Sequence, residues 1–179
     1  MKKIDKELIL SVKSGDAMSA QRLISLGANV DIESDGGVPV LHLANKSSTV
    51  KLLVDSGADV DAKDKYGNCI LHSIKRCEVL KILIEAGAKV NSRNARRDTP
   101  LHIFVNHKAI SMLIANGAKP NLKNKYGETP LHKKRSIDAA RVLVDAGVDV
   151  NARDCVGKTP LHNQIQPEVL SLLVHAGAD

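Results

Sequence analysis

The chain has 179 residues, of which 43% are hydrophobic, and it carries a formal net charge of +6 with a pI of about 9.3. Only 2% of its residues are aromatic and tryptophan is absent, so Leu, Ile, Val and Ala must build the core, which favours stacked short helices over an ordinary globular domain. No apolar run reaches the length of about 18 residues that a membrane helix needs, no secretory signal is present, and three cysteines fit no disulfide framework. These features predict a cytoplasmic protein, while secretion as an effector stays open.

The N-terminal segment, residues 1–30, predicts a helix over Glu7–Lys13 with polar residues on its outer side. The terminal unit of a stacked array needs such a face because no neighbour covers it. We therefore interpret residues 1–30 as an N-terminal cap.

The rest of the chain repeats with a step of 30 residues. The step is visible in a glycine column and in a column of Leu-His pairs, whose members are Gly27, Gly57, Gly87, Gly117, Gly147 and Gly177, and His42, His72, His102, His132 and His162. A fixed period of this length is typical of a solenoid, whose units bury their apolar faces only against neighbours. We predict a single domain over residues 1–179, with units 1–30, 31–60, 61–90, 91–120, 121–150 and 151–179.

The fifth unit shows how one repeat is expected to fold. Asn124–Gly127 predicts a β-turn, since Asn suits its first position and Gly its last. Thr129 is expected to cap a short helix over residues 130–135 that starts with proline. A second helix is expected over residues 137–146, and Gly147 then ends it in the left-handed conformation. The unit therefore reads turn, helix, helix, turn.

Two segments resemble the ankyrin repeat, whose pattern is Gly-x-Thr-Pro-Leu-His. Residues 127–132 and 157–162 match it fully. The resemblance implies an all-α fold, an ankyrin-repeat solenoid of stacked antiparallel helix pairs with β-hairpin fingers. It also implies that the histidine of each Leu-His pair makes local hydrogen bonds that hold the turn and the inner helix. Because the family repeat has about 33 residues and this one has three fewer, we expect a shorter inner helix.

Two repeats depart from the Thr-Pro pattern. The second has Pro39-Val40 and the third has Cys69-Ile70 in its place. Since both lack the threonine cap, we expect them to be the less stable repeats.

Basic residues gather at the predicted fingers and inner-helix turns, which in this family line the concave side. We predict that this side binds an acidic protein or peptide surface, because clustered Lys and Arg attract an oppositely charged partner. Tyr66 and Tyr126 are expected at fingertips, as contact anchors. The predicted binding residues are Lys63, Lys65, Tyr66, Lys75, Arg76, Arg93, Arg96, Arg97, Lys123, Lys125, Tyr126, Lys133, Lys134, Arg135 and Arg153.

The expected function is a non-catalytic, monomeric interaction module that acts as adaptor, scaffold or inhibitor. Alternatives stay open: solvated charges with no partner, the recognition domain of a larger host-directed effector, or nucleic-acid binding, which two Tyr and one Phe support poorly. We expect no cofactor, since no phosphate-binding loop or nucleophile–base arrangement is present. We also expect no metal, because Cys69, His72 and Cys77 lack a fourth ligand.

Overall fold

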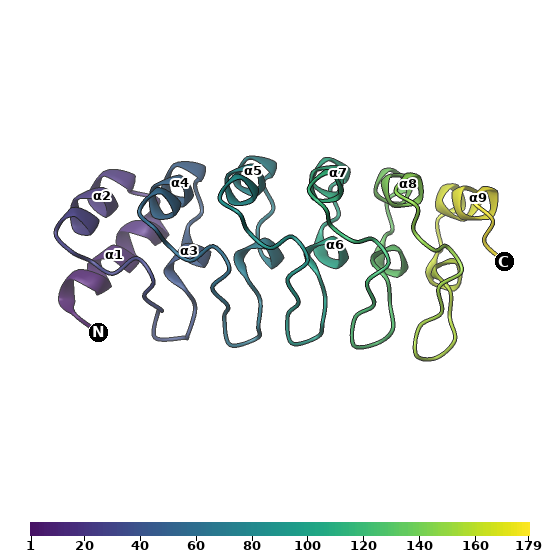
Figure 1. The fold of residues 1–179 in the computed structure, drawn as a ribbon, viewed down its shortest axis with the longest axis horizontal. Coiled ribbons are helices and arrows are strands. Elements are labelled where there is room, and N and C mark those ends of the chain that lie inside the picture. Colours follow the sequence, from purple (N-terminus) through teal and green to yellow (C-terminus); the bar gives the residue numbers. More distant parts are fainter. The chain divides into compact units, whose positions relative to one another are not determined.

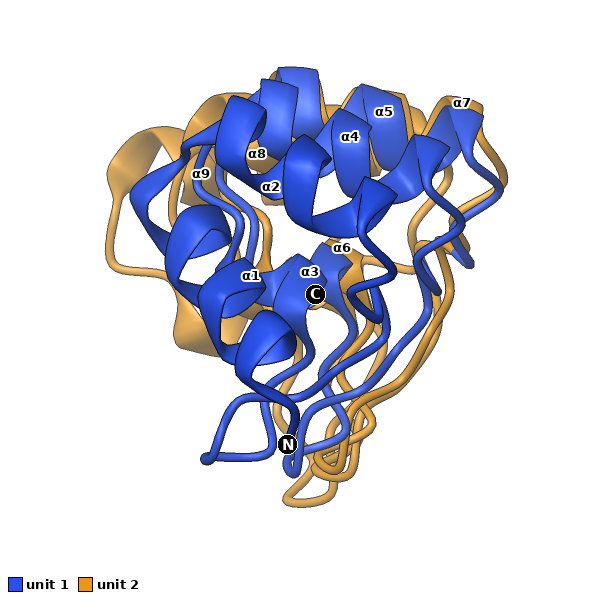
Figure 2. Ribbon diagram, turned by 90° about the vertical axis from the view of Figure 1, so that its left-hand side faces the viewer, with its two compact units in different colours: residues 1–89 blue, residues 90–179 orange.

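The computed structural model describes residues 1–179 and contains helices but no β-strand, so the predicted all-α class is confirmed. The chain divides into two compact units, residues 1–89 (unit 1) and residues 90–179 (unit 2), coloured separately in Figure 2. The division falls beside the predicted boundary between the third and fourth repeats. None of the helices combines the length and the hydropathy needed to cross a membrane.

Unit 1 begins with a long helical hairpin and continues as shorter helix pairs (Figure 1). Its elements are α1 (Lys3–Ser14), α2 (Ala17–Ser25), α3 (Val40–Leu43), α4 (Ser47–Asp55), the 3-10 helix η1 (Ile70–His72) and α5 (Cys77–Glu85). The helix α1 packs on α2 and α3, while α2, α4 and α5 pack in sequence as an outer layer. The helix predicted over Glu7–Lys13 lies inside α1.

Unit 2 consists of three helix pairs in the same arrangement. Its inner elements are α6 (Pro100–Ile103), η2 (Pro130–Lys133) and η3 (Pro160–Asn163), and its outer helices are α7 (His107–Ala115), α8 (Ile137–Asp145) and α9 (Pro167–His175). Neighbouring inner elements pack together, and α8 packs against both α7 and α9. The inner helix predicted over residues 130–135 is therefore a single 3-10 turn, whereas the second helix lies where it was predicted.

The 30-residue period places the same side chain in the core of each pair. Leu113, Leu143 and Leu173 of the outer helices are fully buried. Each outer helix is followed by a glycine at positive φ, such as Gly147 at 75°, which turns the chain toward the next finger. Burying a leucine side chain contributes about 2 kcal/mol, so the column of leucines is a main source of stability.

The fingers are turns closed by side chains, not the β-hairpins that the resemblance implied. In unit 2 the Asn124 side-chain oxygen accepts hydrogen bonds from the backbone N–H groups of Tyr126 (2.9 Å) and Glu128 (3.1 Å). The Asn124 backbone N–H donates to the carbonyl of Glu128 at 2.9 Å. Because the side chain takes up N–H groups inside the turn, no strand ladder forms. The one antiparallel bridge of the chain joins Glu33 and Pro39.

Three histidines of the Leu-His column connect their own inner element to the next finger of the same unit: His42, His102 and His132. In unit 2 the Nδ1 atom of His132 lies 3.1 Å from the backbone nitrogen and 3.0 Å from the hydroxyl of Thr129. Its Nε2 atom lies 3.1 Å from the carbonyl oxygen of Lys158 in the following finger. Nδ1 accepts the hydrogen bond from the Thr129 N–H, and Nε2 donates one to the carbonyl, which is the pattern of the neutral histidine tautomer protonated at Nε2. The expected local role of the histidine is confirmed, and it extends to the neighbouring repeat.

The two repeats without threonine differ from each other. In the third repeat the Cys69 thiol lies 3.1 Å from Nδ1 of His72, and the Cys69 N–H donates to the same atom at 3.2 Å, so cysteine reproduces the threonine arrangement. In the second repeat Pro39 has neither an N–H nor a hydroxyl, and His42 keeps only its bond to the Ala62 carbonyl at 3.0 Å. The lower stability of these two repeats stays a prediction, with the larger effect now expected in the second.

Acid is expected to weaken unit 2 through His102. Burial lowers the pKa of His102 from 6.5 to about 4, so the unfolded chain binds more protons than the folded chain between these values. Stability therefore falls as pH decreases, and the contribution of His102 changes by about 2 kcal/mol between pH 7 and pH 5. Urea unfolding at both pH values should show this loss in the wild type and a smaller loss in His102→Asn. The exposed His107 provides the control: His107→Asn should keep the full loss.

Candidate functional site: the basic fingers of unit 2

The fifteen residues proposed from the sequence fall in both units. Lys63, Lys65, Tyr66, Lys75 and Arg76 belong to unit 1, where all five are exposed and the Lys65 ammonium lies 5.3 Å from the centre of the Tyr66 ring. The other ten belong to unit 2, whose own contacts define the environment of each. Unit 2 therefore carries two thirds of the predicted binding residues on one body.

Two neighbouring fingertips of unit 2 present unpaired cations side by side. The backbone N–H of Lys125 donates to the carbonyl of Arg96 at 2.8 Å, which fixes the two tips against each other. Arg96, Arg97, Lys125 and Tyr126 are all exposed, and the three cationic side chains have no hydrogen-bond or ion-pair partner. We call these four residues the fingertip cluster.

Arg97 adopts a backbone conformation that side chains other than glycine rarely take. Its φ is 60°, the only positive value among non-glycine residues of the chain. The equivalent position in the other fingers is glycine, at Gly37, Gly67, Gly127 and Gly157. A residue with a Cβ atom, such as arginine, pays about 1 kcal/mol to adopt this left-handed backbone conformation. An arginine kept at this cost places one more positive charge at the fingertips.

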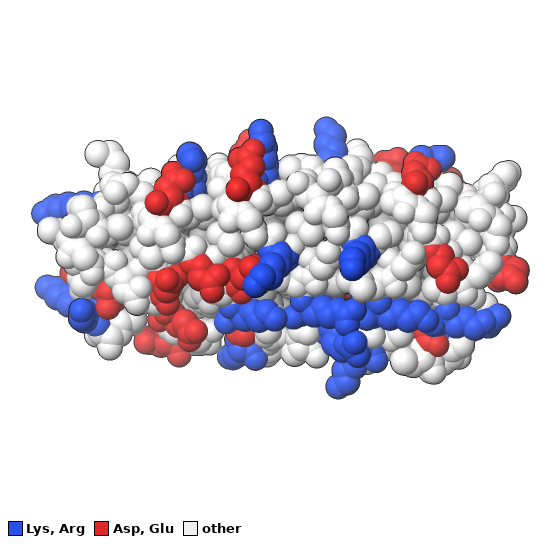
Figure 3. Space-filling view, viewed as in Figure 1, with Lys and Arg blue, Asp and Glu red and all other residues white.

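A second group of cations lies along the fingers. The ammonium of Lys123 donates to the carbonyl of Arg153 at 2.8 Å, and the Arg153 guanidinium donates to the carbonyl of Gly157 at 3.0 Å. Figure 3 shows Lys and Arg side chains in a row over the finger segments of unit 2. Positive charge in unit 2 therefore extends beyond the fingertip cluster.

Lys133 is neutralised within the fold. Its ammonium lies 3.2 Å from the carboxylate of Asp98 and 3.7 Å from that of Glu128. Asp98 is buried; burial raises its pKa, but the hydrogen bond from Asn124 (2.8 Å) and the charge of Lys133 hold the pKa below its usual value overall. Lys133 thus serves a buried polar network, and little of its charge is left for a partner.

Lys134, predicted to bind a partner, is instead inside the protein. Its side chain is 1% exposed, and the ammonium donates to the carbonyls of Leu101 (2.7 Å) and Phe104 (2.5 Å), with His102 at 3.3 Å. Burial and then the charge of Lys133 lower the pKa of Lys134 to about 7. The lysine therefore caps the C-terminal end of α6, and this part of the prediction was wrong because Lys134 occupies a core position of the repeat.

The same buried position continues into the next repeat. Gln164 follows Lys134 by one period, is also buried, and donates from Nε2 to the Lys134 carbonyl at 2.8 Å. The residues one, two and three periods before Lys134 are all apolar: Phe104, Ile74 and Ala44. Phe104, Lys134 and Gln164 therefore form a hydrogen-bonded ladder beneath the inner turns of unit 2, which we call the inner ladder.

Arg135 lies directly after the buried lysine and faces solvent. It is exposed and has no partner. The residues one period before and after it are Val105, 71% exposed, and Ile165, 83% exposed. Sequence reasoning missed these two apolar residues, although aligning the chain at its own period brings all three into one column.

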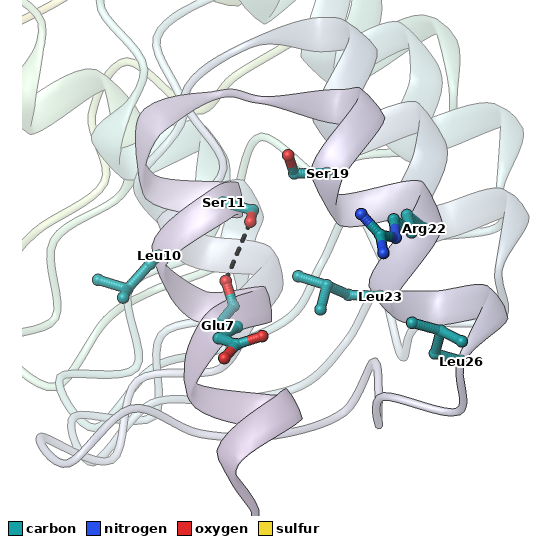
Figure 4. A pocket seen from close by; sticks show the side chains of 7 residues that line it. All are labelled: Glu7, Leu10, Ser11, Ser19, Arg22, Leu23 and Leu26. Carbon is teal, nitrogen blue, oxygen red and sulfur yellow. Dashed lines mark hydrogen bonds between the residues drawn. The ribbon is translucent and has the colours of Figure 1, made fainter.

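A cleft of about 440 Å³ lies between α1 and α2 in unit 1 (Figure 4). Leu10, Leu23 and Leu26 line it together with Arg22 and Glu7. Leu10 is 65% exposed and Leu26 is 63% exposed, so the outer face of the N-terminal hairpin is less polar than predicted.

The structure contains no group of three His, Cys, Asp or Glu residues arranged to hold a metal ion. All three cysteines are free thiols, and Cys69 points at His72 as described above.

Comparisons with known proteins agree with the helix pairs and fingers. A family model described as ankyrin repeats (3 copies) matches residues 8–94, 68–154 and 101–179. The solved ankyrin repeat domain of Bcl-3, a member of the IkappaB protein family, is similar with a TM-score of 0.84 and 28% identity, covering 97% of this chain and 86% of that one. An ankyrin repeat domain from Acinetobacter baumannii has a TM-score of 0.83 at 24% identity, covering 96% and 98% of the two chains. No curated protein sequence matches significantly. With its repeated Leu-His capping, its paired helices and a family match along nearly its whole length, the chain belongs to the ankyrin-repeat family.

Proposed function

We propose that the fingertip cluster of unit 2 binds an acidic surface of a partner protein, and that the chain acts as a cytoplasmic adaptor, scaffold or inhibitor. Ankyrin-repeat domains generally mediate protein–protein interaction and are generally not enzymes. The finer proposal concerns the chemistry of the partner, and it rests on the cations that the fold leaves unpaired.

Arg97 carries the proposal. Its left-handed backbone is unfavourable for any residue but glycine, and the other fingers use glycine. Arg96 and Lys125 add two unpaired charges next to it, with Tyr126, 52% exposed, as an aromatic neighbour. Unpaired cations steer an acidic partner and raise its association rate, and an exposed tyrosine is a frequent contact anchor.

Charge reversal at the fingertips should strongly weaken the binding of an acidic peptide. We expect Arg96→Glu/Lys125→Glu to bind a fluorescein-labelled oligoglutamate peptide at least tenfold more weakly than the wild type by fluorescence anisotropy, since two attractive charges become repulsive. The matched control is Lys108→Glu/Arg141→Glu, which changes the net charge equally on exposed positions of α7 and α8. Equal weakening by both double variants would show that only net charge matters and would contradict the proposal.

Arg97→Gly separates binding from stability in the same assay. The variant should be more stable by about 1 kcal/mol because backbone strain is relieved, yet it should bind oligoglutamate more weakly. Random double-stranded DNA is the comparison probe: tighter binding of DNA than of oligoglutamate would favour nucleic acid as the partner instead.

A further inference from the structure

We infer that Val105, Arg135 and Ile165 form a second contact strip in unit 2, and that it receives an amphipathic helix of the partner protein whose carboxylate is flanked by two apolar side chains. The inference deepens the proposed function and rests on it for the acidic character of the partner. Its evidence is separate, because the strip lies on the inner turns and not at the fingertips.

The strip is a row of three exposed side chains of alternating chemistry. Val105 is 71% exposed, Ile165 is 83% exposed, and Arg135 between them is exposed with no ion pair. The three stand in one column of the repeat, each directly after a member of the inner ladder. Since η2 packs against both α6 and η3, the turns that carry the three residues are neighbours.

The inner ladder links the three turns that carry this row by hydrogen bonds. Lys134 bonds to the Phe104 carbonyl at 2.5 Å, and Gln164 bonds to the Lys134 carbonyl at 2.8 Å. These bonds tie together the backbone beneath Val105, Arg135 and Ile165. Contact residues whose supporting backbone is fixed by such bonds lose little conformational freedom on binding.

The side chains of the row indicate which residues of a partner helix would match them. An unpaired guanidinium favours a carboxylate, and the apolar neighbours on both sides favour aliphatic partners, which exclude water and strengthen the charged pair. Helical elements that pack as neighbours lie about 10 Å apart. An α-helix advances about 10.5 Å in seven residues, so a helix with Leu, Glu and Leu at successive seven-residue steps matches the row.

The test uses two helical peptides that differ at one residue. The acid probe presents Leu, Glu and Leu at seven-residue steps, and the base probe has Lys in place of Glu, on otherwise identical neutral sequences. We expect the wild type to bind the acid probe at least tenfold more tightly than the base probe in anisotropy titrations. Arg135→Glu should reverse this preference, and Val105→Asn/Ile165→Asn should weaken binding of both probes at least threefold.

Arg141→Glu is the matched control, because it makes the same charge change in the same repeat on the outer helix α8. It should keep the wild-type preference. If Arg135→Glu keeps the acid preference, or if the wild type shows none, the inference is overturned. In that case the proposed function would still stand if the wild type binds oligoglutamate and Arg96→Glu/Lys125→Glu weakens that binding. If the wild type binds neither the acid probe nor oligoglutamate, both the inference and the proposed function are refuted.

Discussion

Replacing Lys134 with alanine should lower the free energy of unfolding by about 3 kcal/mol, a large effect for a lysine. The substitution removes the aliphatic stem of a side chain that is 1% exposed, and it leaves the carbonyls of Leu101 and Phe104 without their donor. Relief of charge burial opposes this loss near pH 7, because the carbonyl oxygens compensate the buried ammonium only in part, as its lowered pKa shows. The loss is therefore expected in full near pH 10, where the folded chain holds a neutral lysine and the cavity and the lost hydrogen bonds dominate.

The pH dependence of Lys134→Ala provides a second readout. Burial lowers the pKa of Lys134 from 10.5 to about 7, so the unfolded chain binds more protons than the folded chain between these values. Wild-type stability thus gains from Lys134 as pH rises from 7 toward 10, and the gap to Lys134→Ala should widen. Arg135→Ala, at the adjacent exposed position, should change stability by less than about 0.5 kcal/mol in the same urea titrations. Similar losses in the two variants would refute the burial of Lys134.

Gly127→Ala should be about as damaging as Lys134→Ala, with a loss of about 3 kcal/mol. Gly127 has a φ of 75°, and a Cβ there would lie 2.8 Å from the backbone nitrogen of Cys155 and 3.0 Å from the carbonyl carbon of Asp154. Backbone atoms cannot move aside as a flexible side chain can. The fingers would have to separate, which would also strain the bond from the Cys155 N–H to the Tyr126 carbonyl.

Gly157→Ala controls for the backbone conformation alone. Gly157 has a φ of 83°, but no atom lies within 4 Å of a Cβ placed there. We expect a loss of about 1 kcal/mol from the left-handed conformation only. Thermal or urea unfolding of both variants measures the difference, and equal losses would mean that the two fingers are not in close contact at Gly127.

The helix pairs could be predicted because they depend on the period, whereas the hydrogen-bonding role of the histidine was implied by the resemblance to the ankyrin repeat. Leu143 and His132 recur at fixed steps, and a side chain that recurs at every step must meet the same neighbours in every repeat. The fingers were less predictable, because a β-hairpin and a turn closed by a side chain use the same residue types. In the structure the Asn124 side-chain oxygen accepts from backbone N–H groups that a strand ladder would otherwise use. The division into two units has no signal in the sequence.

The three adjacent cations 133–135 show why the binding residues were only partly predictable. In the sequence they form one basic cluster, but Lys133 is ion-paired, Lys134 is buried and Arg135 is free. Their difference comes from which side of a single turn each occupies. The apolar residues at the equivalent positions of Lys134, including Ile74 and Phe104, were the available signal that this column points inward.

The central claim is that unpaired cations at the fingertips of unit 2 bind acid, while paired and buried cations hold the fold. The most direct measurement is an NMR titration of the ¹⁵N-labelled protein with oligoglutamate. We predict that the amides of Arg96, Arg97, Lys125 and Tyr126 shift progressively, while those of α7, α8 and α9 stay in place. Shifts concentrated on the outer helices, or none at the fingertips at saturating peptide, would contradict the claim.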